Sequence, residues 1–286
     1  MNNKTWIKFI ESIEFPYSKI KPNKALLKKS LISSIQKLPN NFGLLFSGGL
    51  DSNIIALLSK KAKKQFTCYC IGLENSQDLA WAKKSAKLLK IKLKTKILTL
   101  KEVESALKKV IKLLKTNDVT KISIALTIYL ALKITKEKSI VTGLGSEEIF
   151  AGYERHKKSF TSEKSLFKES WQGLKRCYKN DISRDLKISK LFKKQILTPF
   201  LDKDLIIAAM NISPKDKIKN NQKKYILRKI SIELGLPKEL AFRPRKAAQY
   251  GSNILKALDK LARINGFKYK KDYLIALSES LYMCNT

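Results

Sequence analysis

Residues 42–52 read Phe42-Gly43-Leu44-Leu45-Phe46-Ser47-Gly48-Gly49-Leu50-Asp51-Ser52, an apolar run that ends in a glycine turn. The run before Ser47 predicts a short buried strand, and the apolar spacing over residues 51–63 predicts a helix directly after the turn. Two glycines let backbone N–H groups approach an anion closely, and the start of the helix points its unpaired N–H groups at the same place. Residues 47–52 therefore predict a phosphate-binding loop.

The same alternation of strand and helix continues along the chain. It predicts further strands at 66–71, 92–98 and 139–141 and helices at 24–35, 79–89, 101–115 and 122–136. We expect an α/β fold with a doubly wound parallel sheet. From about Phe150 onward the pattern is mostly helical, with no further clear strand. We therefore divide the chain into a helical leader (1–39), an α/β core (40–150) and a helical C-terminal lobe (151–286).

Ligands of such sheets bind at the carboxyl ends of the strands, near the topological switch point. The glycine-bearing turns at 47–52 and 142–148 both follow strands. We expect them to face one pocket.

The net charge of +35 raises the question of a nucleic-acid partner. Only seven of the 59 basic residues are arginine, and the lysines are spread almost evenly. Phosphate-binding surfaces usually concentrate their basic residues and favour arginine. We therefore favour a general composition bias over a nucleic-acid surface, which stays open as the less favoured interpretation.

Other features concern location and metals. The apolar runs are shorter than a membrane span, and the first residues lack the apolar segment of a secretory signal. We expect a cytoplasmic protein without a membrane partner. The four cysteines form no C-x-x-C pair and the chain has one histidine, which disfavours a zinc site.

The first loop has a clear chemical interpretation. Ser47 and Ser52 supply hydroxyl donors, and Asp51 would repel phosphate unless it holds Mg²⁺ on the released pyrophosphate. The alternative is a surface turn in which Asp51 or Ser52 caps the helix. The order Ser-Gly-Gly-x-Asp-Ser lacks the Gly-Lys ending of a Walker A loop and resembles the loop of the ATP pyrophosphatase (PP-loop) family. That family cleaves ATP between its α and β phosphates and activates an acyl or carbonyl oxygen as an adenylate. A nitrogen or sulfur nucleophile then displaces AMP.

The second loop, Thr142-Gly143-Leu144-Gly145-Ser146-Glu147-Glu148-Ile149-Phe150-Ala151-Gly152-Tyr153, resembles a signature of asparagine synthetases. Segments 71–79, 198–202 and 236–246 resemble further motifs of that family in the same order. The resemblance covers about residues 24–251 and implies an adenine nucleotide alpha hydrolase-like fold.

The resemblance also implies roles for individual residues. Asp51 and Glu147 would share Mg²⁺, and Glu148 matches the family's glutamate. Arg245 or Lys246 would contact the ATP phosphates, and these five residues form the expected catalytic set. The expected ATP-binding residues are Phe46, Ser47, Gly48, Gly49, Asp51, Ser52, Ile71, Gly72, Thr142 and Gly143.

Two positions depart from the synthetases. Leu144 stands where they have a glutamate that supports adenylation and the handling of ammonia, and Ser123 lies where they have an arginine around aspartate. The pattern is closest to the divergent asparagine synthetase domain-containing proteins. Both departures weaken the expectation of asparagine as product. His156, the single histidine, is either a surface or capping residue or a catalytic one.

The expected function is an ATP-dependent, AMP-forming amide ligase. It would adenylate a carboxylate such as aspartate for attack by ammonia or an amine. Residue 2 is Asn2 rather than the cysteine of a glutaminase, so we expect no glutaminase domain and ammonia that arrives free or from a separate glutaminase. The alternatives are a tRNA-modifying PP-loop enzyme and a non-catalytic ATP-binding sensor or scaffold.

Overall fold

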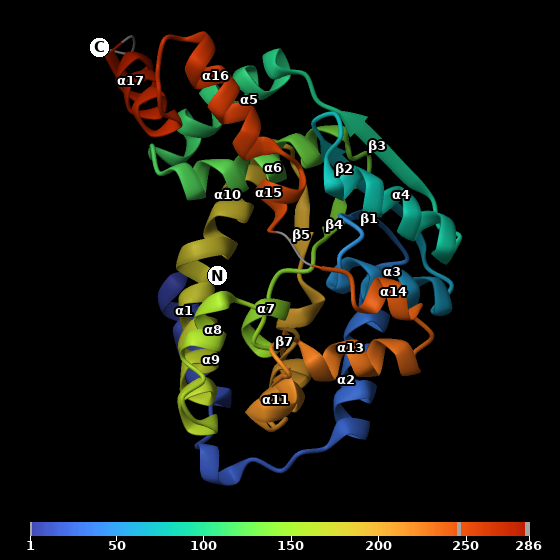
Figure 1. The fold of residues 1–286 in the computed structure, drawn as a ribbon. Coiled ribbons are helices and arrows are strands. Elements are labelled where there is room, and N and C mark those ends of the chain that lie inside the picture. Colours follow the sequence, from blue (N-terminus) through green and yellow to red (C-terminus); the bar gives the residue numbers. More distant parts are fainter. Residues whose placement is uncertain (1, 245–246, 284–286) are drawn as a thin grey trace.

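The computed structural model describes residues 2–244 and 247–283. Its centre is a sheet of five parallel strands in the order β3-β2-β1-β4-β5 (Figure 1). The strands are β1 (Asn41–Leu45), β2 (Gln65–Gly72), β3 (Leu93–Ile97), β4 (Ser139–Val141) and β5 (Gln195–Leu197). The chain builds β1, β2 and β3 outward in one direction and then returns to place β4 beside β1. The switch point therefore lies between β1 and β4.

Helices cover both faces of this sheet. One core joins Phe42 and Leu44 of β1 to α1 (Asn3–Ile13), α2 (Lys24–Gln36), α3 (Leu50–Lys61), α4 (Gln77–Leu89), α9 (Glu163–Cys177), α11 (Lys203–Met210), α13 (Tyr225–Glu233) and α14 (Lys238–Ala241). The other joins Ile71 and Ile140 to α5 (Leu100–Leu114), α6 (Val119–Ile134), α10 (Ser183–Leu191), α16 (Ile254–Ile264) and α17 (Lys270–Met283). The predicted doubly wound α/β fold is confirmed.

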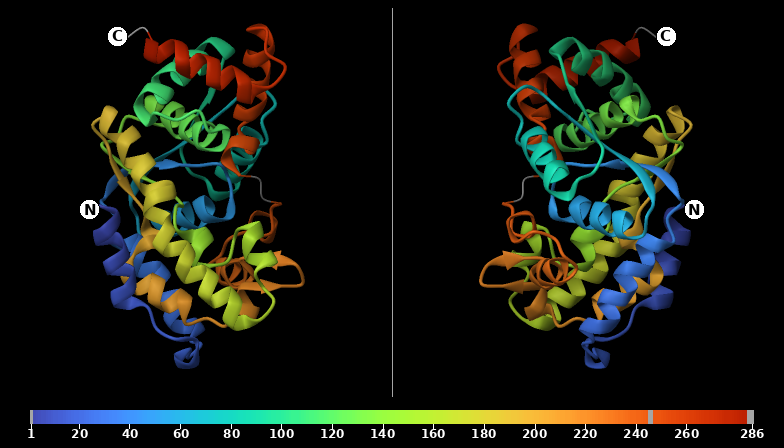
Figure 2. Two further views of the ribbon diagram at one scale, coloured as in Figure 1. Left: turned by 90° about the vertical axis from the view of Figure 1, so that its left-hand side faces the viewer. Right: turned by 90° about the vertical axis from the view of Figure 1, so that its right-hand side faces the viewer.

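The remaining elements are short. They are α7 (Ser146–Ile149), α8 (Glu154–Lys158), α12 (Pro214–Lys217), α15 (Ala248–Gly251), the one-turn helices η1 (Tyr17–Lys19), η2 (Tyr178–Ile182) and η3 (Pro199–Leu201), and the hairpin of β6 (Ile218–Lys219) and β7 (Gln222–Lys223). The N-terminal helices, in blue, and the C-terminal helices α16 and α17, in red, lie at opposite ends of the molecule (Figure 2). None of the described helices is both long and apolar enough to span a membrane.

Local sequence explains where several helices begin. Asn23 caps α2 by accepting from the N–H of Leu26. Thr99 and Glu102 form a reciprocal capping box at the start of α5, in which each side chain accepts from the other residue's N–H. These caps keep the observed starts close to the predicted ones.

One prediction about the sheet is wrong. We expected no strand after Phe150, yet β5 pairs in parallel with β4 through three residues. The edge strand is too short to show an alternating pattern, and its first residue, Gln195, follows two lysines. Its pairing depends on β4 rather than on local propensity. The division of the chain at residue 150 stays a prediction.

Candidate active site

The first loop joins β1 to α3 and turns at Gly48, whose φ is 66°. A Cβ at this position would lie 2.6 Å from the carbonyl oxygen of Trp81, so glycine is required on both counts. The Nδ2 of Asn53, a fully buried residue of α3, donates to the carbonyl oxygen of Gly48 at 2.9 Å. Ser52 Oγ donates to the carbonyl oxygen of Gly49 at 3.1 Å. The loop is thus held by the helix that follows it.

The second loop leaves β4 and enters α7 through Gly145, whose φ is 96°. It touches the first loop, because a Cβ on Gly143 would lie 2.9 Å from the Cβ of Asp51. Ser146 Oγ also donates to Asp51 Oδ1 at 2.6 Å. The two loops meet at the switch point, as predicted.

Lys224 contacts residues of both loops, and the sequence pattern did not indicate it. Its Nζ lies 2.8 Å from both carboxylate oxygens of Asp51 and 2.6 Å from Glu147 Oε1. It also donates to Ser146 Oγ at 2.9 Å, and its side chain is only 3% exposed. The residue precedes α13 in the left-handed conformation, with φ 55°. In a lysine-rich chain, one lysine in a Lys223-Lys224 pair does not stand out.

Arg243 fixes the other side of the first loop. One guanidinium nitrogen donates to the carbonyl oxygen of Ser47 at 2.6 Å, and another donates to Asp78 Oδ1 at 2.9 Å. The side chains of Arg243 and Asp78 are both buried. The guanidinium of Arg243 therefore binds groups of the protein itself. The neighbouring candidates Arg245 and Lys246 lie outside the described residues.

The loops border a cavity of about 500 Å³. Seven predicted site residues line it: Ser47, Gly49, Asp51, Ser52, Thr142, Gly143 and Glu147. Phe46, Gly48, Ile71, Gly72 and Glu148 are not among the residues that line it. Phe46 and Ile71 are buried in the two cores, and Glu148 lies behind Tyr153. Helix α6 contributes Ile124 and Ile128, together with Thr120, to the lining.

Tyr153, Asp181 and Asp185 line another side of the cavity, and Glu148 lies behind Tyr153. We call Glu148, Tyr153, Asp181 and Asp185 the acidic wall. Tyr153 Oη donates to Glu148 Oε1 at 3.0 Å. Arg184 donates to Asp181 Oδ1 at 3.0 Å and to Asp185 Oδ1 at 2.8 Å. The second motif contains Glu148 and Tyr153, but nothing in the sequence indicated Asp181 and Asp185, because residues 178–185 carry no recognisable motif.

Burial raises several pKa values in the acidic wall. The pKa of Glu148 is raised to about 7, first by burial and then by the negative charges of Asp181 and Glu147. Burial likewise raises the pKa of Asp185 to about 6, although Arg184 opposes the shift. Negative charge is thus concentrated and poorly solvated on this side of the cavity.

His156 takes the capping role of its two interpretations. Its Nδ1 accepts from the N–H of Tyr153 at 3.2 Å at the start of α8, and the ring is fully buried. Burial, with the positive charges of Arg155 and Lys217, lowers its pKa to about 3. The ring is therefore neutral near pH 7.

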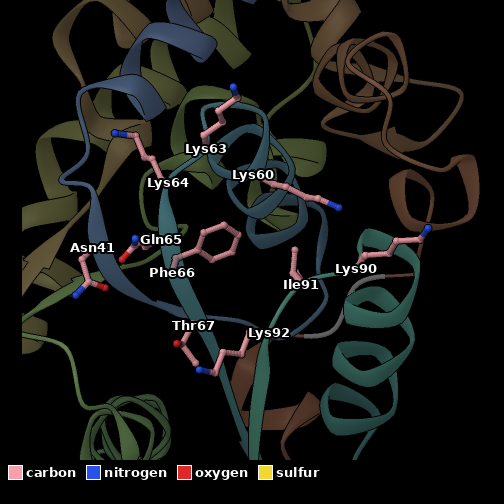
Figure 3. Close-up of a pocket in the computed structure, with 10 residues that line it drawn as sticks. All are labelled: Asn41, Lys60, Lys63, Lys64, Gln65, Phe66, Thr67, Lys90, Ile91 and Lys92. Carbon is pink, nitrogen blue, oxygen red and sulfur yellow. The ribbon is translucent and has the colours of Figure 1, made fainter.

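A separate hollow lies at the other end of the strands, beside the first residues of β1 and β2 (Figure 3). It measures about 480 Å³ and is lined by Lys60, Lys63, Lys64, Lys90 and Lys92, among others. Lys60 and Lys64 donate to the carbonyl oxygens of Leu89 and Leu38. The amine nitrogens drawn in Figure 3 point apart rather than toward one point. This arrangement fits a solvated lysine-rich surface better than a built phosphate site.

Comparison with known proteins places the fold and the two loops in a family. The asparagine synthase family model matches residues 38–187 and, in an overlapping match, residues 158–266. This chain belongs to the asparagine synthase family. It is 31% identical to the putative asparagine synthetase (glutamine-hydrolyzing) 1 of Methanocaldococcus jannaschii, over 86% of this chain and 52% of that protein. It is 30% identical to asparagine synthetase (glutamine-hydrolyzing) 1 of Lotus japonicus, over 99% of this chain and 51% of that protein.

The chain spans about half the length of these relatives. Both loops, Lys224 and Arg243 lie inside the part that the asparagine synthase family model matches. Leu144 lines the cavity between the loops and the acidic wall, so an apolar side chain occupies the position where we expected the family's glutamate. Ser123 donates to the carbonyl oxygen of Thr120 and borders a neighbouring hollow rather than this cavity.

Proposed function

We propose that this chain is the ATP-binding part of an asparagine-synthetase-like ligase that joins a carboxylate to ammonia or an amine and forms AMP and pyrophosphate. The observation that carries the proposal is the meeting of two glycine loops at the switch point, with Asp51, Glu147 and Lys224 in contact between them. Family membership supports it, and the names of the relatives, asparagine synthetases, support an amide product.

In this proposal the ATP phosphates lie against Ser47–Ser52 and the start of α3. Backbone N–H groups and the positive end of the helix favour an anion there, and the hydroxyl groups of Ser47 and Ser52 add donors. Phe46, Ile71, Gly72, Thr142 and Gly143 shape the adenine end of the same site. Arg245 and Lys246 are proposed to contact the phosphates from the segment that follows Arg243.

The residues present fit a magnesium ion. Oxygen atoms of Asp51 and Glu147 both lie within 2.8 Å of one Lys224 nitrogen, so two carboxylates converge on a single point. Carboxylate oxygens together with substrate phosphates are the donors that Mg²⁺ prefers. Asp51 and Glu147 would hold the ion, which neutralises negative charge on pyrophosphate as it departs.

The chain's own contribution is positioning and fixed charge. Lys224 is buried, and its ammonium lies beside the phosphate loop, where it can turn from the carboxylates of Asp51 and Glu147 to a phosphate once Mg²⁺ is bound. Arg243 keeps the backbone of Ser47 in place by joining it to α4. A reaction that proceeds without a covalent enzyme intermediate depends on such preorganisation.

The acyl substrate and the source of nitrogen belong to the same proposal. Aspartate is the first carboxylate to test, and Leu144 argues for a wider panel because it cannot carry a proton or a charge. Ammonia would arrive free or from a separate glutaminase.

The test is the exchange of labelled pyrophosphate into ATP, measured with Mg²⁺ and a panel of carboxylates. We expect exchange that depends on one carboxylate class, release of AMP when an amine is added, and loss of at least about 100-fold in Asp51→Asn. Asp272→Asn, a change at an exposed carboxylate of α17, is the matched control.

Two outcomes would replace the proposal. ATP binding without exchange under any condition would favour a non-catalytic sensor. Exchange that appears only when tRNA is added, with binding that weakens steeply with salt, would favour a tRNA-modifying enzyme.

A further inference from the structure

The acidic wall contains a buried acceptor that lacks a donor. Glu148 is 1% exposed, and its Oε2 has no hydrogen-bond partner among residues 2–244 and 247–283. A carboxylate oxygen of Glu148, a carboxylate oxygen of Asp181 and Cys177 Sγ all lie within 4.8 Å of one another. Leaving a buried acceptor unsatisfied costs about 1–3 kcal/mol, and more for a charged group. The unsatisfied oxygen therefore points to a missing donor beside Asp181.

The charges around this point call for a cation. Three carboxylates, those of Glu148, Asp181 and Asp185, gather here against one guanidinium, that of Arg184. This local excess of negative charge stands in a chain whose net charge is +35. Burial of like charges is unfavourable, and it is relieved by protonation, as the raised pKa of Glu148 reflects, or by a positive group that enters between them. The site is open to such a group, because Asp181 and Tyr153 line the cavity directly.

The donor set suits an ammonium group. Burial and the neighbouring carboxylates raise the pKa of Cys177 far above its usual range, so its thiol stays protonated and adds no charge to the two carboxyl groups. An ammonium nitrogen that donates two hydrogen bonds of about 2.8 Å at a tetrahedral angle places its acceptors roughly 4.6 Å apart. The Glu148 and Asp181 oxygens lie within 4.8 Å of each other, a limit that admits this separation, and the Tyr153 oxygen offers a third acceptor.

The local backbone brings these acceptors to the nucleotide loops. Asp181 lies in η2, a single π-helical turn between α9 and α10, and such turns often occur at functional sites. Glu148 follows Glu147 in α7, so one short helix contributes to the Asp51–Lys224 cluster and to the acidic wall. A group held by Glu148 and Asp181 would thus lie in the same cavity as the phosphate loop.

We propose that Asp181, Glu148 and Tyr153 form a subsite for one ammonium group. The inference rests on the proposed ligase function and sharpens it, because the group belongs either to the free ammonium nucleophile or to the α-ammonium of an amino-acid substrate. Leu144, at the position of the family's glutamate, leaves the recognition of positive charge to these residues.

Thallium(I), a heavy monovalent stand-in for ammonium, tests the subsite without any turnover. Crystals of the full chain soaked in a thallium(I) salt should show anomalous density between Asp181 and Glu148. The density should persist in Asp272→Asn and disappear in Asp181→Asn, whose half-saturating thallium concentration should rise at least tenfold. Absent density in the unaltered chain, density only at Asp51 and Glu147, or unchanged binding in Asp181→Asn would overturn the proposal.

Competition distinguishes the two sources of the ammonium group. Displacement of thallium by ammonium chloride but not by aspartate identifies the nucleophile. Displacement by aspartate but not by succinate, which lacks the amino group, identifies the substrate's α-ammonium. Failure of both to displace it contradicts an ammonium subsite. Tyr153→Phe provides a second variant if Asp181→Asn misfolds, and it should weaken binding because it removes one acceptor.

The readout also separates this inference from the proposed function. Thallium binding at the acidic wall in a chain without pyrophosphate exchange would support the ammonium subsite and contradict the proposed ligase function. Pyrophosphate exchange without thallium binding would support the ligase function and contradict the subsite.

Discussion

Two buried lysines should respond to the same substitution with opposite signs. Lys224 is paired with Asp51 and Glu147, whose side chains are 19% and 10% exposed. Changing Lys224 to Met leaves two poorly solvated carboxylates facing each other. Removing one partner of a buried ion pair costs about 3–5 kcal/mol. For a domain of this size that loss lowers the Tm by roughly 6–20 °C.

Among the residues that the structure describes, no carboxylate pairs with Lys217. It is 1% exposed, and the contact of its Nζ is with Met210 Sδ at 3.6 Å. Burial lowers its pKa to about 7 from a usual value of 10.5. Between these two values the unfolded chain binds a proton that the folded chain does not, so stability rises with pH across this window. Lys217→Met removes the penalty and should stabilise the fold at pH 7 by on the order of a few kcal/mol, with a smaller gain near pH 10.

Thermal unfolding followed by circular dichroism, without nucleotide, measures both variants in one buffer. Adding Glu147→Gln to Lys224→Met should recover part of the lost stability, because it removes one of the two facing charges. Magnesium should raise the Tm of Lys224→Met more than that of the unaltered chain. The reasoning fails if Lys224→Met is as stable as the unaltered chain, or if Lys217→Met destabilises it to a similar extent.

Three further changes test the geometry of the site. Gly48→Ala should weaken ATP binding at least 100-fold in calorimetric titrations, because its φ of 66° and the Trp81 carbonyl at 2.6 Å both exclude a Cβ; near-normal affinity would contradict the loop assignment. Gly152→Ala should displace Glu147, because the new Cβ would lie 1.7 Å from Glu147 Oε2. ATP binding should then depend less on Mg²⁺, and an unchanged magnesium titration would argue against Glu147 as a ligand. Arg243→Lys should weaken ATP binding about tenfold, since one ammonium cannot replace the two-pronged contact to Ser47 and Asp78; equal affinities would show that the fork is dispensable.

The sequence was sufficient for features that depend on local pattern. The strand, glycine turn and helix over residues 42–61 form a local unit, and the parallel sheet follows from the repeat of such units. The meeting of the two loops was predictable from the switch-point rule, because the loops follow the carboxyl ends of the neighbouring strands β1 and β4. These predictions required no knowledge of long-range packing.

Features that depend on tertiary contacts were not predictable. Lys224 lies 173 positions from Asp51, and lysine is too common in this chain for one of them to be singled out. The strand β5 forms because β4 offers it an edge. Asp181 reaches the cavity through a π-helical turn that periodicity cannot reveal. Each of these positions is specified by its neighbours in space rather than along the chain.

The central claim is that one cavity binds ATP across both loops. A crystal structure with Mg²⁺ and an ATP analogue that cannot be cleaved between its α and β phosphates tests it most directly. We expect the phosphates against the N–H groups of residues 47–52, the adenine toward Ile71, and a metal ion between Asp51 and Glu147 with Lys224 moved onto a phosphate. A nucleotide bound instead in the lysine-lined hollow beside the first residues of β1 and β2 would contradict the account.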